Sequence, residues 1–497
     1  MEGVVAAYFL TLVGLAVFGA HRYVVLYLFH RHKNHRDDPP PGRFDDLPPV
    51  TVQLPLYNEM YVASRLVDAV ARLDYPRDRL QIQVLDDSTD ETRGVVDEAV
   101  AFWRGQGVNV EAVRRPTREG FKAGALEFGL ASATGEFIAV FDADFVPRAD
   151  FLNRTVHEFT DPSIGMVQAR WEHLNEGYSI ATRLQALYLD GHFVMEHAAR
   201  NWSGRYFNFN GTAGIWRKQA ILDAGGWQHD TITEDLDLSY RAQMAGWKFK
   251  YLLDYAVPGE LPALLSAFRS QQYRWAKGAI ETARKILPPL WRGPYPLKVK
   301  IEATVHLLSN CAYLLVALLC LLSGPSMMIR VHMGWRATAW LDLLLFMIVS
   351  FSIGVYYLEC QRVIGKSVRR AALYLPLLMG LGIGMVVNNA RAVVSGMRGR
   401  KSAFVRTPKH KIETRGDTVL GKKYRAAFNS TILVEALGAL FFIPPLLYAI
   451  RYDVWVSVPF QLLFFTGFSY LVLATLMQTA RTAWSLRGRG IVGEDTV

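Results

Sequence analysis

The sequence predicts an α/β domain with a mostly parallel sheet, joined to an α-helical transmembrane bundle. Between about residues 50 and 260, strand-like apolar runs alternate with amphipathic stretches, the pattern of a parallel sheet covered by helices. Before and after this part lie apolar stretches long enough to cross a bilayer, which takes about 20 residues. The apolar fraction is 51% and the charged fraction only 20%, which excludes a disordered chain.

The net charge of +10 does not indicate nucleic-acid binding, because most of it lies in one segment. Residues 398–425 contain ten basic and two acidic side chains, a local net charge of +8. No basic stripe remains that could follow a phosphate backbone, so we expect no nucleic-acid partner. The sequence leaves the oligomeric state open.

Residues 1–36 are predicted to form an N-terminal transmembrane anchor. Val4 to Phe29 is apolar over sufficient length and is interrupted by His21 and Arg22. The segment starts Met-Glu and ends in the basic run HRHKNHR, whereas a cleaved signal peptide has a basic start and a small-residue cleavage site. We therefore expect the anchor to be retained.

Residues 37–262 form the predicted soluble domain. Its apolar runs TVQL, IQVL, FIAVF and MVQA end in polar or acidic residues and are separated by amphipathic stretches. In a sheet of this kind, ligands bind beyond the carboxyl ends of the strands, so we expect the functional site there.

The rest of the chain is predicted to be largely membrane-embedded. Apolar stretches recur at 302–324, 338–359, 371–392, 429–450 and 456–480. The positive-inside bias requires the basic runs to face the cytoplasm. Three full crossings before the +8 segment would put that segment outside, so one of the first three stretches cannot be a full span. The Gly-rich stretch 371–392 is therefore predicted to be re-entrant, interfacial or a helical pair.

We therefore expect a multi-pass protein, which we assign to the plasma (inner) membrane, with the soluble domain on the cytoplasmic side. The remaining divisions are interfacial helices at 263–300, transmembrane segments at 301–392 and 428–482, a basic cytoplasmic loop at 393–427 and a tail at 483–497.

Acidic residues follow two of the predicted strands. Asp87, after IQVL, is placed to meet a ribose or base, although such residues also cap helices. Asp142 and Asp144 follow FIAVF, and two carboxylates one residue apart can converge on a hard cation, Mg²⁺ or Mn²⁺, that also binds a diphosphate. The alternative for this pair is a solvated turn.

Two motifs lie on predicted helices. Glu234 and Asp235 begin an amphipathic stretch, where a carboxylate is either a cap or a general base that deprotonates an attacking hydroxyl. In the run Gln271 to Trp275, Arg274 can bind a diphosphate and Trp275 offers an aromatic face to a sugar ring, or anchors the chain at a membrane interface.

His192 and His197 lie near Asp190 and Glu196, but their spacing matches no zinc pattern. We interpret them as an ordinary polar helix face.

Together these segments resemble the family 2 glycosyltransferases, specifically the membrane-embedded processive synthases of the cellulose-synthase superfamily. Asp87, Asp142-x-Asp144, Thr233-Glu234-Asp235 and Gln271-x-x-Arg274-Trp275 are similar to that group's D, D-x-D, T-E-D and Q-x-x-R-W, in order. Segments such as VTVQLPLYNE, FKAGAL, FNGTAGIWR and RSQQYRW look like those of the cellulose-synthase-like A and C groups, which include plant mannan and glucomannan synthases. Plant mannan synthases typically have V-E-D where this chain has T-E-D, so the donor sugar stays open.

The resemblance covers roughly residues 50–285 and implies a GT-A fold with a role for each motif. On the donor side, Asp87 would bind the nucleotide, Asp142 and Asp144 the metal and diphosphate, Arg274 the diphosphate, and Lys122 would lie near the nucleotide sugar. Asp235, beside Glu234, would be the catalytic base, and the acceptor would be bound by Trp275, Gln271, Asn210 and Gly211.

The basic loop contains the run Phe404 to Lys409, which resembles the gating loop F-x-V-T-x-K of cellulose synthases with Arg406 in place of the Val. Such a loop closes over the nucleotide, where Lys409 would screen the diphosphate charge. The alternative is a basic loop that touches anionic lipid.

The sequence therefore predicts an inverting, processive β-glycosyltransferase that elongates a mannan, glucomannan or glucan from GDP-mannose or UDP-glucose and passes it through the membrane. Its partners would be the nucleotide-sugar donor, the growing polysaccharide acceptor and the lipid bilayer. The alternatives are a non-processive enzyme that glycosylates a lipid and a non-catalytic export channel. The intact carboxylates speak against the channel.

Overall fold

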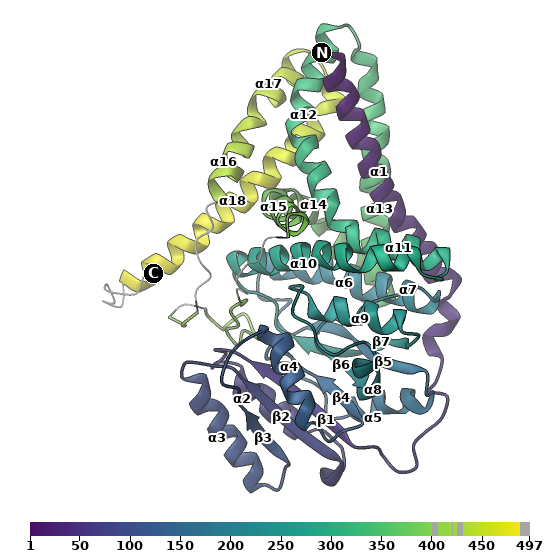
Figure 1. The fold of residues 1–497 in the computed structure, drawn as a ribbon. Coiled ribbons are helices and arrows are strands. Elements are labelled where there is room, and N and C mark those ends of the chain that lie inside the picture. Colours follow the sequence, from purple (N-terminus) through teal and green to yellow (C-terminus); the bar gives the residue numbers. More distant parts are fainter. Residues whose placement is uncertain (400–405, 420, 425–430, 488–497) are drawn as a thin grey trace.

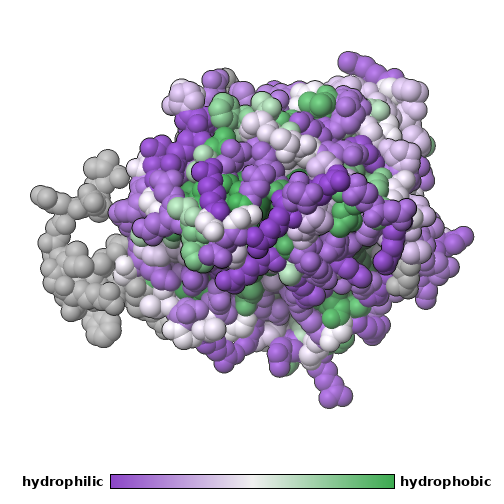
Figure 2. Space-filling model, turned by 90° about the horizontal axis from the view of Figure 1, so that it is seen from below, coloured by the Kyte–Doolittle hydropathy of each residue, from purple (hydrophilic) through white to green (hydrophobic). Residues whose placement is uncertain are grey.

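The structure is a computed structural model that describes residues 1–399, 406–419, 421–424 and 431–487. Its α/β domain lies below a group of long helices, and helices α10 (Leu265–Arg292) and α11 (Leu297–Leu308) run across the boundary between the two parts (Figure 1). The face of the α/β domain that points away from the long helices is largely hydrophilic (Figure 2).

A seven-stranded sheet forms the centre of the α/β domain, with strand order β3-β2-β1-β4-β6-β5-β7. The strands are β1 (Val50–Leu56), β2 (Leu80–Asp86), β3 (Val110–Val113), β4 (Phe137–Val140), β5 (Ile164–His173), β6 (Gly214–Arg217) and β7 (Lys248–Gly259). Only β6 runs antiparallel to its two neighbours, and every other neighbouring pair is parallel. The predicted fold class is confirmed, and β3, β6 and β7 join the four strands that the apolar runs predicted.

The central strands are buried on both faces. Every residue of β1, β2 and β4 is buried, as expected for parallel strands covered by helices on both sides. Four of their polar side chains pair across the ladder: Thr51 donates to Gln81 at 2.8 Å, and Gln53 donates to Gln83 at 3.1 Å. These pairs satisfy polar groups that would otherwise be costly to bury.

Helices cover the two faces in separate groups. Side chains of α2 (Ala63–Ala71) and α3 (Thr92–Gly105) share one buried apolar cluster with β1 and β2. A second cluster lies on the opposite face and includes side chains of α4 (Phe121–Ser132), α6 (Ile180–Asp190) and α9 (Glu234–Met244). Phe29 of α1 (Glu2–Arg31) and Tyr356 of α13 (Ala339–Val363) belong to this second cluster, so the long helices and the domain share one core.

In the described residues, five helical segments are long and apolar enough to cross a membrane: Glu2–Arg31, Leu297–His332, Arg336–Val363, Thr431–Arg451 and Trp455–Gln478. They contain α1 (Glu2–Arg31), α12 (Ala312–His332), α13 (Ala339–Val363), α16 (Thr431–Phe441), α17 (Ile443–Arg451) and most of α18 (Val458–Arg487). Several begin or end a few residues outside the predicted stretches, because a helix continues past the apolar part of its sequence.

The irregular stretch predicted at 371–392 consists of two helices, α14 (Val368–Gly384) and α15 (Val386–Met397), bent by 47° at their junction. Helix α15 packs along α10. The contact is close at Gly396, where an added Cβ would lie 2.8 Å from the carbonyl oxygen of Lys277. A larger residue at Gly396 would therefore push the two helices apart.

Candidate active site

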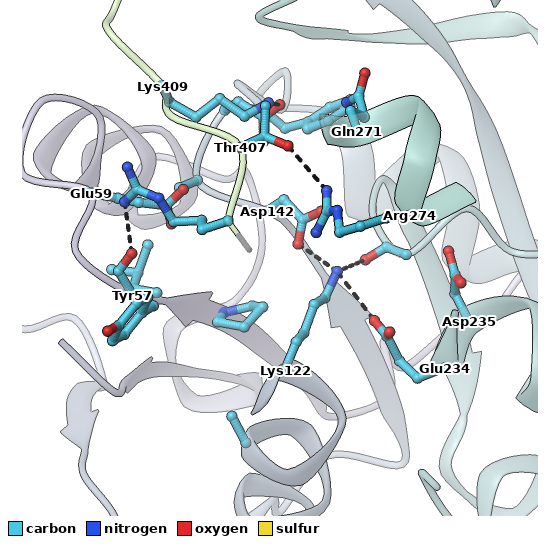
Figure 3. Close-up of a pocket in the computed structure, with 18 of the residues that line it drawn as sticks. Tyr57, Glu59, Lys122, Asp142, Glu234, Asp235, Gln271, Arg274, Thr407 and Lys409 are labelled. Carbon is cyan, nitrogen blue, oxygen red and sulfur yellow. Dashed lines mark hydrogen bonds and ion pairs between the residues drawn. The ribbon is translucent and has the colours of Figure 1, made fainter. Parts of the chain in front are cut away.

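A cavity of about 180 Å³ lies at the carboxyl ends of β1, β2 and β4, between the sheet, α9, α10 and the loop after residue 405. Its lining includes every site residue that the sequence predicted, namely Asp87, Lys122, Asp142, Asp144, Asn210, Gly211, Glu234, Asp235, Gln271, Arg274, Trp275 and Lys409. Figure 3 shows the side chains of Lys122, Asp142, Glu234 and Arg274 pointing toward one another. Residues from seven separate stretches of sequence thus meet in one place.

The carboxylates that follow β4 are each bound by a lysine. Asp142 Oδ1 lies 2.5 Å from Lys122 Nζ, and Asp144 accepts a hydrogen bond from Lys409 Nζ. The hydroxyl of Thr212 accepts the backbone N–H of Asp142 at 2.9 Å, which fixes the turn after the strand. Both carboxylates are therefore charge-balanced by the protein itself.

Lys122 lies at the centre of the cavity (Figure 3). Its ammonium contacts Asp142, donates to the carbonyl of Gly211 at 2.8 Å, and lies 3.8 Å from Glu234 Oε1. Burial acts to lower the pKa of Lys122, but the charges of Asp142 and Glu234 outweigh it and raise that pKa above its ordinary value. Lys122 is consequently a cation among the carboxylates of the cavity.

Asp87 lies just beyond β2 and is held by an arginine that the sequence analysis did not single out. Arg115 donates from Nε and Nη2 to the two carboxylate oxygens of Asp87, at 2.8 and 2.6 Å. Such two-pronged pairs fix the carboxylate plane. Arg115 also donates to the backbone carbonyls of Glu119 and Phe121, so it ties Asp87 to the start of α4.

Helix α9 begins at Glu234, which places Glu234 and Asp235 in its first turn. The backbone N–H of Leu236 donates to Asp235 at 2.8 Å. Burial, together with the charge of Glu234, raises the pKa of Asp235 to about 7. A carboxylate that titrates near neutral pH is suited to accept a proton from an attacking hydroxyl.

Asn210 and Gly211, which the resemblance assigns to acceptor binding, lie in the loop before β6. Gly211 has a φ of +79°, in the left-handed region that favours glycine. An added Cβ there would lie 3.0 Å from Asp235 Oδ2 and 3.1 Å from Lys122 Nζ. This loop therefore passes directly beside the candidate base.

Helix α10 brings Gln271, Arg274 and Trp275 to the side of the cavity nearest the long helices. Trp275 packs against a buried apolar cluster that contains Phe193 and Leu261. Arg274 Nη2 donates to the hydroxyl of Thr407 at 3.1 Å. The helix thus joins the cavity, the basic loop and the membrane-type helices.

Residues 406–409 of the basic loop lie along the cavity, which Arg406, Thr407 and Lys409 help to line. Arg406 donates to the carbonyl of Tyr57 at 2.7 Å, Thr407 contacts Arg274, and Lys409 contacts Asp144. The loop therefore contacts both the sheet side and the α10 side of the cavity. Phe404 and Val405, which the resemblance also assigns to the gating loop, lie outside the described residues.

The donor set fits a divalent cation that arrives with a diphosphate. The described part of the chain contains no cluster of three or more His, Cys, Asp or Glu side chains suited to hold a metal. Mg²⁺, however, is commonly bound by one or two carboxylates together with substrate phosphates and water. Asp142 and Asp144 supply two carboxylates to a cavity that also contains Arg274 and Lys122.

The lining residues that were not predicted as site residues include Tyr57, Glu59, Arg118 and Trp171. The guanidinium carbon of Arg118 lies 3.3 Å from the ring centroid of Tyr57. Burial raises the pKa of Glu59 to about 7. Tyr57 and Glu59 follow β1, and Arg118 follows β3. Since ligands bind at the carboxyl ends of strands, these positions could have indicated the three residues.

The interpretation of His192 and His197 as an ordinary polar helix face is wrong. His197 is fully buried, and both side chains contact Asn210 of the cavity. The helix has a π-helical turn at Gly191–Glu196, which shifts the side chains that follow it relative to a regular helix. That turn has no plain sequence signal.

Comparison with known proteins agrees with the predicted resemblance. Residues 48–278 match the family described as "Glycosyltransferase like family 2". "Probable glucomannan 4-beta-mannosyltransferase 7" of Oryza sativa subsp. japonica is 45% identical over 246 residues, which are 48% of this chain and 42% of that protein. "Glucomannan 4-beta-mannosyltransferase 9" of Arabidopsis thaliana is 43% identical over 244 residues, 48% of this chain and 46% of that protein.

The chain spans about half the length of the curated relatives it matches. Among solved structures, a mannosyltransferase from Pyrobaculum calidifontis in complex with GDP-Man and Mn²⁺ is 20% identical, with a TM-score of 0.47 over 78% of this chain and 100% of that chain. Apart from Lys409, every predicted site residue falls inside the matched region 48–278.

Proposed function

We propose that the chain transfers a hexose from a nucleotide sugar to the growing end of a β-glycan. The match of residues 48–278 to the family described as "Glycosyltransferase like family 2" supports this proposal. The observation that carries this proposal is the cavity itself. The carboxylate of Asp235, which is suited to act as a base, lines the same cavity as the carboxylates of Asp142 and Asp144. The cations of Lys122 and Arg274 line it as well. The cavity thus combines the groups needed to bind a diphosphate and to activate a hydroxyl.

On the donor side, Asp142 and Asp144 would hold Mg²⁺ or Mn²⁺ with the diphosphate, and the ion would supply charge neutralisation as the diphosphate leaves. Arg274 and Lys122 would bind diphosphate oxygens through charge-assisted hydrogen bonds. Asp87, held in place by Arg115, would bind the nucleoside.

On the acceptor side, Asp235 would take the proton of a sugar hydroxyl while the oxygen of that hydroxyl attacks the anomeric carbon. A new bond forms between the oxygen and the anomeric carbon, and the bond from that carbon to the diphosphate oxygen breaks. One displacement of this kind inverts the configuration. Trp275, Gln271 and Asn210 would hold the acceptor sugar, with the indole face stacked on the ring.

Mannose is the donor sugar best supported, since the matched curated relatives are described as glucomannan 4-beta-mannosyltransferases. We therefore propose a β-1,4-linked mannan or glucomannan as the product and GDP-mannose as the main donor. UDP-glucose is the second donor to test.

We further propose that the domain faces the cytoplasm and that α14 and α15 do not cross the bilayer as one span. Arg406 and Lys409 contact the α/β domain, so the loop that follows α15 lies on the same side as that domain. An even number of crossings must then separate α10 from the loop, and α12 and α13 supply two. Basic residues in both parts favour the cytoplasmic side.

The test is to incubate the purified protein separately with GDP-mannose and UDP-glucose, with Mg²⁺ or Mn²⁺, and to digest the product with linkage-specific hydrolases. A long polymer cut by a β-1,4-mannan hydrolase supports the proposal. A product that stays at one or two sugars on a lipid indicates a glycolipid enzyme. The absence of any transfer would overturn the proposal.

A further inference from the structure

Two histidines hold the side chain of Asn210 from opposite ends of its amide. His192 Nε2 lies 3.0 Å from Asn210 Nδ2, and His197 Nε2 contacts Asn210 Oδ1 within hydrogen-bond distance. The two rings are 4.2 Å apart, on the π-helical turn Gly191–Glu196 and at the start of α7 (His197–Trp202). π-Helical turns are rare and frequently lie at functional sites.

The neighbouring side chains define which ring nitrogens of His192 and His197 donate a hydrogen bond and which accept one. Burial acts to raise the pKa of Glu196, but the charge of Arg200 and the hydrogen bond from His192 hold that pKa well below its ordinary value. Glu196 is therefore a carboxylate and accepts the Nδ1–H of His192 at 2.9 Å. Nδ2 of Asn210 can only donate, so Nε2 of His192, which faces it, is the acceptor and takes one N–H of the amide.

The second ring confirms this orientation. Burial lowers the pKa of His197 well below its ordinary value, so its ring is neutral and carries one N–H. That N–H donates to Asn210 Oδ1, because Nδ1 of His197 has no partner among the described residues. An amide turned the other way would lose both contacts.

On the side away from the cavity, the hydrogen-bond network continues to helices α11 and α1. Arg200 lies 3.2 Å from Glu196 and donates to Glu302 of α11 at 3.0 Å. Glu302 in turn lies 3.0 Å from His21 of α1. Both Arg200 and Glu302 are nearly fully buried, so His192 is oriented by fixed charges.

In the other direction, Asn210 leads directly to the reacting groups. Its backbone N–H donates to Gln168 at 3.1 Å, and the next carbonyl, that of Gly211, accepts from Lys122 at 2.8 Å. The side chain of Asn210 itself lines the cavity together with Asp235. Its second N–H and second lone pair take part in no hydrogen bond within the described residues.

We propose that His192 and His197 are positioning residues that orient the Asn210 amide so that its remaining N–H and lone pair bind hydroxyls of the acceptor sugar. The inference rests on the proposed function and adds how the acceptor is held. The histidines do not touch the substrate, and they act through Asn210.

The test uses a matched pair of substitutions at each histidine. A glutamine amide reaches about as far as Nε2 of histidine, whereas an asparagine amide reaches only about as far as Nδ1. His192→Gln and His197→Gln therefore keep a partner for Asn210, and His192→Asn and His197→Asn remove it. The measured quantities are the KM for a β-1,4-manno-oligosaccharide acceptor, the KM for the donor, and the rate of donor hydrolysis by water.

We expect each asparagine variant to raise the acceptor KM about tenfold, the effect of one lost hydrogen bond of about 1.4 kcal/mol. Donor KM and donor hydrolysis should stay within about twofold, and each glutamine variant should recover most of the acceptor affinity. If the asparagine variants do not fold, Asn210→Asp carries the same test, because a carboxylate offers His192 no N–H.

Equal effects of the glutamine and asparagine variants, or parallel changes in donor and acceptor KM, would overturn the inference while leaving the proposed function intact. A wild-type protein that transfers sugar from neither donor would instead overturn the proposed function, and the inference with it.

Discussion

The ammonium of Lys409 donates a hydrogen bond to the carboxylate of Asp144, so the basic loop binds directly to the D-x-D motif. The side chains are only 8% and 12% exposed. A divalent cation that arrives with a diphosphate would need the same carboxylate. The loop lysine and the metal therefore compete for Asp144, and this competition is open to experiment.

Replacement of the loop lysine tests that competition. In Lys409→Ala, the affinity of the nucleotide-free protein for Mn²⁺ should rise by about tenfold, because a charge-assisted hydrogen bond no longer has to break. The donor KM should rise, since the diphosphate loses a cation. Isothermal titration calorimetry or electron paramagnetic resonance of Mn²⁺ measures the Mn²⁺ affinity. Lys423→Ala, which removes an exposed pair with Glu91, is the control, and equal Mn²⁺ affinity in both variants would contradict the prediction.

Removal of the metal-binding charge should stop the reaction. Asp144→Asn, or addition of a chelator, should abolish transfer and weaken metal-dependent binding of the nucleotide, with the fold retained. Asp46→Asn removes an exposed carboxylate that pairs with Arg79 and should leave both unchanged. Undiminished transfer in the presence of chelator would exclude a role for the ion.

The candidate base can be separated from the groups that bind the donor. Asp235→Asn should lower the transfer rate at least about 100-fold, the usual scale of general base catalysis, while the donor still binds. Equilibrium binding of the nucleotide sugar and single-turnover rates distinguish the two effects. A collapse of donor affinity in this variant would make Asp235 a binding residue.

Transfer should depend on pH through the same carboxylate. Burial raises the pKa of Asp235 to about 7, so below about pH 7 the base is increasingly protonated and cannot accept the proton of the hydroxyl. The kcat/KM should therefore fall as the pH drops, approaching tenfold per unit well below the pKa, and level off above it. A profile that is flat between pH 5 and 8 would refute the assignment.

Elongation should depend on the aromatic face at the α10 side of the cavity. Trp275→Ala should reduce polymer synthesis far more than hydrolysis of the donor by water, because hydrolysis needs no acceptor. The matched control is Trp291→Ala, on the same helix but 46% exposed and outside the cavity lining. Equal losses in polymer synthesis and hydrolysis would mean that Trp275 supports the fold and does not bind the acceptor.

Much of the site could be predicted because its groups follow recognisable strands. Asp87, Asp142 and Asp144 lie directly after β2 and β4, and parallel strands bring their carboxyl ends to one edge of the sheet. Local sequence also placed Asp235 at the start of α9. Arg115 could not be predicted, because it follows β3 whereas its partner Asp87 follows β2. The sequence of one segment does not show how two strands align.

The sequence by itself determined the elements: buried apolar runs became strands, amphipathic stretches became the helices that cover them, and long apolar stretches became membrane-type helices. These depend on side-chain periodicity, which is a local property. Only the tertiary structure decided that Lys409 binds Asp144, that His192 and His197 hold Asn210, and that α14 and α15 meet at a bend. Such contacts join residues far apart in the chain, and they depend on how whole elements pack and on where each side chain then points.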